Sequence, residues 1–557
     1  MALFAELRRR NVLKVALLYA VASWLVAWFV RNAGAGLGLP AWTETFVLLV
    51  LAIGFPVALI FAWIYEITPS GIKKAVAVDQ TQSIVYKTGQ KLNAAVAVLA
   101  VLGVLALVGE GLMPEFEFEP KFEFLVPAPP TGEPPVSLDV PGEIRSLRLD
   151  NGLRIVVWPD HDIPNVAMYN FVRAGSRNER PGITGMSHIF EHMMFNGTKN
   201  LEPGEFDRIM EAAGGNNNAY TSRDVTVYIN WFPRSALEVI FELEADRLQY
   251  LTIDPDSLES ERGVITSERS ASVDDDKLEH LMEQMYATAY VAHPYRWPII
   301  GWPSDIAAWT AQDLVDYFRT YYAPNNSTMI FTGDVTPEEI FRLAEEHFAK
   351  IQAQTPPPAV RTVEPEQAGT RRIVIEADAR APLLHLAFHA GRAADPDTLP
   401  MGLLLEILVG DESSRLHRLL VEERQLAISI HGWQDEGFDP GLVYFYATLP
   451  PGGDPTAVEQ AVLEEFRRIV AEGVTEAELG KARNIALADF WRGLATIDGK
   501  AQGLGNFDVF QGSYEKLFDL PARVEAVTAD HLRAAAARVL RAENMTVGVL
   551  RGAGEQP

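Results

Sequence analysis

The sequence of 557 residues predicts an α+β region built from two similar halves and preceded by three membrane-spanning helices. The membrane part is predicted by three apolar runs within the first 113 residues and by the short polar connections between them. The α+β part is predicted by strand and helix patterns that alternate from residue 149 to the end. We therefore expect an anchored chain with a folded region outside the bilayer.

The composition limits the classes of function that are open to this chain. Apolar residues make up 48% and charged residues 22%, which is enough to build hydrophobic cores and excludes global disorder. Asp and Glu outnumber Lys and Arg by 74 to 48, and the formal charge of −26 argues against a nucleic-acid partner. The absence of cysteine excludes disulfides, thiolate metal sites and cysteine nucleophiles.

The apolar runs, at about residues 15–30, 46–65 and 92–109, contain 16, 20 and 18 residues. A rise of about 1.5 Å per residue gives helices of roughly 24–30 Å, close to the thickness of a hydrocarbon core. A buried core helix is the alternative for the shortest run. Three runs in succession leave no soluble protein to bury them, so we expect three transmembrane helices.

The basic residues around these runs predict their orientation. Arg8, Arg9, Arg10 and Lys14 precede the first run and four lysines separate the second from the third, whereas Arg31 alone lies between the first two. Because basic residues favour the cytoplasmic side, the N-terminus is expected in the cytoplasm and the residues after the third run on the other side. In a bacterium, this predicts a multi-pass inner-membrane protein with a periplasmic folded region.

Two further segments support this organisation. The sequences FAELRRRN (4–11) and YEITPSGIK (65–73) make about 75 residues similar to a membrane module found before unrelated domains in proteobacterial proteins. Residues 114–143 are rich in Pro and Glu. Proline restricts φ and lacks an N–H donor, so this segment is predicted to be a semi-rigid, extended linker.

The two halves are expected at 144–365 and 366–557, with about 200 residues each. In the first half, the patterns predict strands at 154–158, 166–172 and 226–231 and helices at 185–195, 204–213, 236–251 and 257–272. In the second half, strand and helix patterns recur at 373–376, 383–389, 400–408 and 441–449, followed by helices near 455–471 and 475–496 and a strand at 544–550.

Residues 188–192, with the sequence HIFEH, carry the strongest functional signal. On a helix, His188 and His192 lie one turn apart, and Glu191 falls on the same face. Two imidazoles at this spacing can bind one zinc ion, and the inverted motif is a metalloprotease signature. The motif predicts one Zn²⁺ per chain with Glu191 as general base.

A catalytic zinc usually has three protein ligands and one open position. Glu261 and Glu268 are seven residues apart and share one helix face. One of them could therefore bind the metal, while the other forms a hydrogen bond to a side chain that binds the metal. From the pattern alone this choice stays open, because other acidic residues are near: Glu242, Glu244, Asp246 and Glu259.

These motifs resemble the pitrilysin/insulinase family of zinc metallopeptidases, which includes the mitochondrial processing peptidases. The resemblance covers about 410 residues from Asn151 onward and includes RAGSRNE (173–179), GGNNNAYT (214–221), HPY (293–295) and YYAPNN (321–326). The family's third ligand lies about 75 residues after the second histidine, and Glu268 is 76 residues after His192. The resemblance therefore implies that Glu268 is the ligand and that Glu261 supports it from outside.

The resemblance also assigns a substrate-binding segment. In the family, the residues that match Asn218 and Ala219 pair with the substrate backbone as an added strand. An ordinary turn before a strand is the alternative interpretation of this segment.

The second half departs from the metal-binding pattern. Leu403 and Ile407 stand where the first half has its two histidines, so this half cannot bind zinc in the same way. His385 and His389 are also four residues apart, but they fall in a predicted strand and are expected to be packing residues.

Active members of the family often carry an Arg–Tyr pair that holds the scissile carbonyl. Val421 and Ile428 stand at the corresponding positions here. The resemblance therefore implies that Arg424 or a partner chain replaces the pair.

The predicted function is a membrane-anchored zinc endopeptidase that hydrolyses peptides or small unfolded proteins. The alternative is an inactive, membrane-tethered subunit of the same fold that binds peptides or acts as a scaffold. Family members enclose substrate between four α+β domains. A chain with two is therefore expected to dimerise with itself or with a zinc-free homologue.

Overall fold

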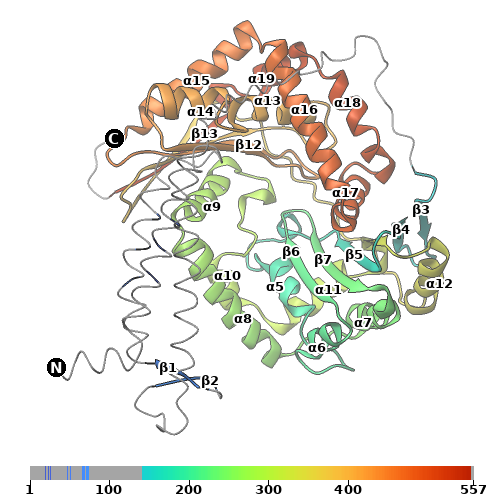
Figure 1. Ribbon diagram of the computed structural model, residues 1–557. Helices are drawn as coiled ribbons and strands as arrows, with labels where there is room; N and C mark the ends of the chain where they lie inside the picture. The colour runs from blue at the N-terminus through green and yellow to red at the C-terminus, as the bar shows by residue number, and fades with distance from the viewer. Residues whose placement is uncertain are drawn as a thin grey trace, which may run out of the picture. The chain divides into compact units, whose positions relative to one another are not determined.

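The computed structural model describes residues 141–552 continuously, the strands β1 (Tyr65–Thr68) and β2 (Gly71–Lys74), and six separate helical residues between 19 and 55 (Figure 1). Apart from these positions, the three runs expected to span the membrane and the linker 114–143 lie outside the described residues. Contacts divide the chain into a unit of residues 1–131 and a unit of residues 132–557.

In the first unit, β1 and β2 form an antiparallel hairpin in which Tyr65 pairs with Lys74. Tyr65, which the sequence analysis included in the helix 46–65, is therefore a strand residue. Within the residues that the structure describes, no helix has the length and apolar character needed to cross a bilayer.

The second unit begins with a six-stranded sheet of order β3-β4-β8-β5-β7-β6. Only β4 and β8 run parallel, and β6 forms one edge of the sheet. The strands are β3 (Arg145–Arg148), β4 (Arg154–Pro159), β5 (Asn165–Val172), β6 (Asn216–Thr221), β7 (Thr226–Pro233) and β8 (Ser327–Gly333). Its helices are α5 (Met186–Met193), α6 (Glu205–Ala212), α7 (Leu237–Tyr250), α8 (Pro255–Arg269), α9 (Lys277–Ala289), α10 (Pro303–Ala308), α11 (Ala311–Tyr321) and α12 (Pro337–Phe348).

A five-stranded sheet of order β11-β12-β10-β13-β9 forms the second half, and only β9 and β13 run parallel. The strands are β9 (Arg371–Ala377), β10 (Leu383–His389), β11 (Ser429–Gln434), β12 (Leu442–Thr448) and β13 (Met545–Gly552). The helices are α13 (Thr398–Val409), α14 (Arg415–His417), α15 (Pro455–Glu472), α16 (Glu476–Gly493), α17 (Ile497–Phe510), α18 (Leu520–Ala526) and α19 (Ala529–Val539). Alternating apolar residues of β10, β12 and β13 pack on α13, α15 and α19 to form its core.

One helix of each half packs on the sheet of the other half. Helix α17 of the second half packs on β5 and β8, and α9 of the first half packs on β9, β10 and β13 (Figure 1). Helix α17 approaches β5 closely because residue 505 is glycine, and a Cβ there would overlap the Phe171 ring. Arg154 of β4 also forms a bidentate ion pair with Asp508 of α17, with both N–O distances at 2.8 Å. The two sheets are thereby joined into one unit.

Two predicted helices end earlier than expected. The helix expected at 475–496 is α16, which ends at Gly493, and Thr496 then starts α17 by accepting a hydrogen bond from the Gly499 N–H. The helix expected at 257–272 is α-helical only to Arg269 and continues as a π-turn over Ser270–Asp274.

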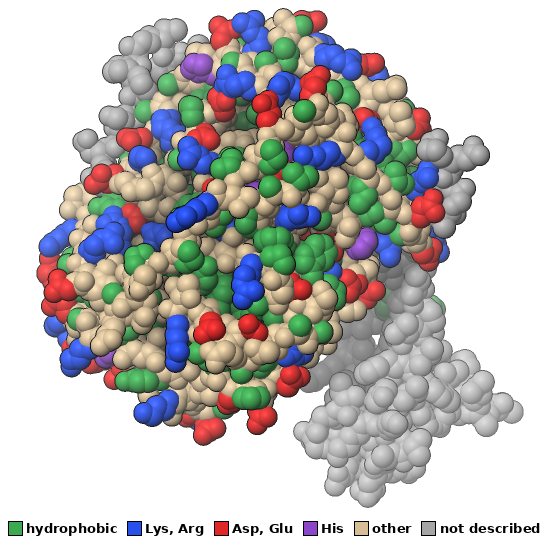
Figure 2. Space-filling model, turned by 180° about the vertical axis from the view of Figure 1, so that it is seen from behind, with side chains coloured by type: hydrophobic (Ala, Val, Ile, Leu, Met, Phe, Trp, Pro, Cys, Tyr) green, Lys and Arg blue, Asp and Glu red, His purple; other side chains and the backbone are tan. Residues whose placement is uncertain are grey.

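Charged side chains of both signs are interspersed over the face shown in Figure 2. The excess of acidic residues is therefore not gathered into one patch on this face. Such mixing is typical of a solvated protein surface.

Candidate metal centre

The metal motif lies on α5, whose N-terminus is held by a buried carboxylate. Gly185 precedes the helix with φ of 86°, and its N–H and that of Ser187 both donate to Glu179 at 2.7 Å. The Ser187 hydroxyl is 2.6 Å from the Tyr317 hydroxyl. Burial raises the pKa of Glu179 to about 8, although the two backbone donors oppose this. The first turn of α5, which contains His188, is therefore held in place by these hydrogen bonds.

His188, His192 and Glu268 lie together, as predicted. The Nε2 atom of His188 is 3.5 Å from one oxygen of Glu268, and the Nε2 atom of His192 is 3.3 Å from the other. One ligand atom from each of the three residues lies within 4.8 Å of the other two. Helices α5 and α8 therefore bring two nitrogens and a carboxylate to one point.

Glu261 lies two turns before Glu268 on α8 and faces the other ring nitrogen of His192. Its carboxylate is 3.5 Å from the Nδ1 atom of His192 and accepts a hydrogen bond of 3.0 Å from the Asn196 side chain. This leaves the Nε2 atom of His192 directed at Glu268. An outer carboxylate on the second ring nitrogen is the usual support of a metal-binding histidine.

The electrostatics of the group match a cation site. Hydrogen bonds from His188 and His192 hold the pKa of the Glu268 carboxyl well below its usual range, so it is ionised at neutral pH. Burial alone would lower the pKa of His192, but hydrogen bonds to Glu261 and Glu268 outweigh it and raise the pKa to about 9. Two imidazoles and one ionised carboxylate are a donor set that suits zinc.

Glu191 stands between two cavities that meet at this group. It lines a cavity of about 430 Å³ together with His188 and Glu268. It also lines a cavity of about 400 Å³ together with His192 and Glu261. A carboxylate placed beside the donors and open to both cavities can reach a water molecule there.

Asn218 and Ala219 line the second of these cavities and belong to the edge strand β6, not to a turn. The N–H of Ala219 donates to the side chain of Asn218 at 2.9 Å. Strand β6 pairs with β7 alone, so its other edge is free. An open edge beside the metal donors can accept an added strand.

In the second half, the residues that replace the metal donors are packing residues. Leu403 and Ile407 of α13 are buried in the core. His385 is fully buried between Tyr444 and Tyr446, and this burial lowers its pKa to about 3. Ring nitrogen Nε2 of His389 lies 2.9 Å from the Ala289 carbonyl. The packing role expected for these two histidines is confirmed.

Arg424 does not reach the metal centre. Its guanidinium pairs with Glu464 of α15 at 3.3 Å, and it lines neither cavity that Glu191 lines. Ile428 is exposed. Within one chain, Arg424 therefore does not line the cavities at this metal centre, and the replacement of the pair by Arg424 or by a partner chain stays a prediction.

Sequence reasoning missed Arg223, which lines the cavity of His188 and Glu191. Its guanidinium carbon lies 3.5 Å from the centre of the Tyr286 ring. The residue sits in the turn between β6 and β7, where no periodic pattern marks it.

Two models of known protein families match the α+β region of this chain. Residues 155–301 match the family model described as insulinase (peptidase family M16), and residues 308–486 match the one described as peptidase M16 inactive domain. The first match contains the metal motif and Glu268, and the second contains most of the half without a metal motif.

Individual relatives agree with these matches. The zinc protease PqqE of Helicobacter pylori is 31% identical over 351 residues, which cover 62% of this chain and 79% of the relative. The β subunit of the mitochondrial-processing peptidase of Bos taurus is 29% identical, over 72% of this chain and 82% of the relative. The crystal structure of a protease from Helicobacter pylori superposes with a TM-score of 0.71 at 28% identity, covering 73% of this chain and 99% of that chain.

Proposed function

This chain belongs to the insulinase family, peptidase family M16, and on that premise we propose that it is a zinc-dependent endopeptidase. One observation carries the proposal. His188, His192 and Glu268 converge within 4.8 Å, and Glu191 lies beside them on the same helix. Peptides or small unfolded proteins are the substrates, because an edge strand can pair only with an extended chain.

His188, His192 and Glu268 would hold the zinc ion, with Glu261 keeping the His192 ring in place. Bound zinc would polarise the scissile carbonyl and lower the pKa of a water molecule. Glu191 accepts the proton of the attacking water and then delivers it to the leaving amine. Asn218 and Ala219 hold the substrate extended across this group.

A peptide-binding subunit without turnover is the second candidate. It is favoured by the match of residues 308–486 to an inactive domain and by Val421 and Ile428 at the positions of the carbonyl-binding pair. The complete donor set of the first half favours the enzyme.

We also propose that the three apolar runs anchor the chain in a bacterial inner membrane, with the peptidase region in the periplasm. The two α+β halves would form half of a four-domain chamber, so the working form would be a dimer with itself or with a zinc-free homologue. Light scattering on the detergent-solubilised chain, with identification of co-purifying chains, tests this. A monomer alone would contradict it.

The decisive experiment on catalysis is Glu191→Gln. The variant should bind as much zinc as the wild type but cleave a fluorogenic peptide at least about 100-fold more slowly, because the proton acceptor is lost. Metal content is measured by elemental analysis and cleavage by fluorescence. Glu345→Gln on α12, an exposed residue away from the centre, makes the same charge change and should leave the rate unchanged.

Two results would contradict the proposal. One is turnover by Glu191→Gln close to that of the wild type. The other is wild-type cleavage that survives complete chelation of the metal.

A further inference from the structure

A separate cavity lies within the first half, where the C-terminal end of α7, helix α11 and residues 350–354 meet. Its volume is about 500 Å³, inside the range of roughly 300–1,000 Å³ that is usual for ligand pockets. It shares no lining residue with the two cavities of the metal centre. The cavity is therefore distinct from the place where a peptide would be cleaved.

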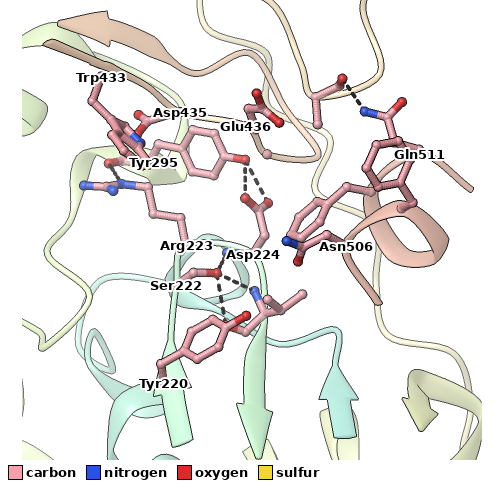
Figure 3. Close-up of a pocket in the computed structure, with 15 residues that line it drawn as sticks. Tyr220, Ser222, Arg223, Asp224, Tyr295, Trp433, Asp435, Glu436, Asn506 and Gln511 are labelled. Carbon is pink, nitrogen blue, oxygen red and sulfur yellow. Dashed lines mark hydrogen bonds between the residues drawn. The ribbon is translucent and has the colours of Figure 1, made fainter. Parts of the chain in front are cut away.

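The charge of this cavity is opposite to that of the others. Among its lining residues, all of which belong to the described part of the chain, only Arg319 of α11 and Lys350 are charged. Within that part of the chain, no ion pair engages either side chain. By contrast, the cavity between the two halves is lined by Asp224, Asp435 and Glu436 (Figure 3), and acidic residues also line both cavities of the metal centre. Two uncompensated cations in a chain with a formal charge of −26 favour an anionic ligand.

The rest of the cavity wall is largely apolar and rich in aromatic rings. Tyr250, Phe318 and Tyr322 line it, and 43% of the Tyr250 surface is exposed. Leu248 and Ile351 reach it from the buried core of the first half. A flat apolar group can pack against these side chains, so the cavity combines cationic and aromatic surface.

The segment that carries Lys350 is held in place. The side-chain amide of Asn151 donates to the carbonyls of Phe348 and Ile351, at 2.8 and 2.9 Å. These two carbonyls flank Lys350, and Asn151 is itself buried. The backbone on this side of the cavity is therefore fixed without a ligand.

The opposite wall of the cavity supports the metal helix α5. The rings of Phe318 and Tyr322 pack on the ring of Phe190, with centres 5.8 and 4.9 Å away. The Tyr322 hydroxyl is 3.0 Å from the Tyr228 hydroxyl, which donates to the Phe190 carbonyl at 2.8 Å. Phe190 is the central residue pair's buried member in the motif HIFEH. A ligand in this cavity would therefore contact the side chains that hold the back of the metal helix.

We propose that this cavity binds a small organic acid, a carboxylate attached to an aromatic body. The carboxylate binds to the guanidinium of Arg319 and the ammonium of Lys350, and the aromatic body packs against Tyr250 and Phe318. Arginine binds carboxylates through two parallel N–H donors, and stacked or tilted aromatic rings attract each other beyond the area that they bury. The site lies outside the cavities of the metal centre, so the proposal does not rest on peptide cleavage.

The test uses the zinc-loaded, full-length protein and matched probes: naphthylacetate, its neutral amide and naphthylethylamine. Isothermal titration calorimetry should show saturable binding of the acid, about tenfold tighter than that of the amide, because the amide lacks the charge that the two cations bind. The amine should bind more weakly than the amide, because two cations repel it.

Variants identify the cavity as the place of binding. Arg319→Gln and Lys350→Gln should each weaken binding of the acid about fivefold and leave that of the amide unchanged. Tyr250→Ala should weaken both, because the aromatic contact is lost. Arg467→Gln on α15 makes the same charge change at an exposed residue outside the cavity and should bind all three probes like the wild type. The three lining residues are exposed, and an unchanged melting temperature shows that each variant is folded.

Three results would overturn the proposal. One is equal affinity for the acid and the amide, and another is an affinity for the acid that neither glutamine variant changes. The third is displacement of naphthylacetate by inorganic phosphate at equal concentration, because phosphate has no apolar body and the cavity would then bind any anion. All of these measurements are made without a peptide, so they are independent of the proposed cleavage.

Discussion

At the scale of single residues, the metal donors depend on neighbours that make no contact with a metal. His188 is the third residue of α5, so any movement of the start of the helix moves its ring. Glu179 holds that start through two backbone N–H groups and is almost completely buried. It belongs to the segment RAGSRNE, whose role was not evident from the sequence.

Glu179→Ala should therefore weaken both the fold and the metal centre. It leaves two buried N–H groups without an acceptor, which costs about 2–4 kcal/mol of unfolding free energy. Zinc affinity should fall about tenfold or more, since outer supports of a ligand have effects of this size. Thermal denaturation and zinc titration measure the two effects, with Glu345→Ala as the control. Unchanged zinc affinity would show that Glu179 does not position α5.

At the scale of elements, the edge strand β6 is the part that connects the fold to the substrate. It is bonded to β7 on one side only, and Tyr220 lies opposite Val227 in that register. Its residues Ala219, Tyr220 and Thr221 line the cavities that also contain the metal donors. A change confined to this edge should therefore affect binding more than folding.

Ala219→Pro is the corresponding prediction. Proline removes the N–H that Ala219 donates to the Asn218 side chain, and edge strands tolerate proline. The KM for a peptide should rise at least about tenfold, while the melting temperature changes by only a few degrees. Ser146→Pro, on the opposite edge strand β3, should leave KM unchanged. Equal effects of the two prolines would contradict a substrate strand on β6.

At the scale of the whole α+β unit, the exchange of α9 and α17 makes the two halves depend on each other. A cavity of about 290 Å³ lies where the halves meet, since β6 and its following turn form one wall and β11 with α17 the others. The geometry of the site therefore depends on packing between residues more than 200 positions apart.

Gly505→Ala tests this dependence. A methyl group there would overlap the buried Phe171 ring, and overpacking of this kind typically costs about 1–3 kcal/mol. Calorimetry should show one transition for residues 132–557, shifted to lower temperature as a whole. Gly480→Ala on α16, where a Cβ meets nothing within 4 Å, should be neutral or slightly stabilising. Two separate transitions would contradict the coupling.

The helices and strands that could be predicted from the sequence are those in which apolar residues recur at a regular spacing. Strand 383–389 matches β10 at both ends, and the helix predicted at 455–471 matches α15 to one residue. Strand β8 was missed because both of its faces are buried, which removes the alternation. Helix α17 was not predicted, because its three glycines oppose helix formation, and its contacts with the first half stabilise it instead.

The amino-acid sequence by itself determined the pairing of His188 with His192 and the place of Glu191, because the period of a helix converts their spacing into one face. Only the tertiary structure decided the rest: that Glu268 rather than another acid meets both histidines, that Arg424 pairs with Glu464, and that Arg223 lines a cavity between the two halves. Helical periodicity acts over a few residues. Contacts across dozens to hundreds of residues depend on how sheets and helices pack, and no local pattern encodes them.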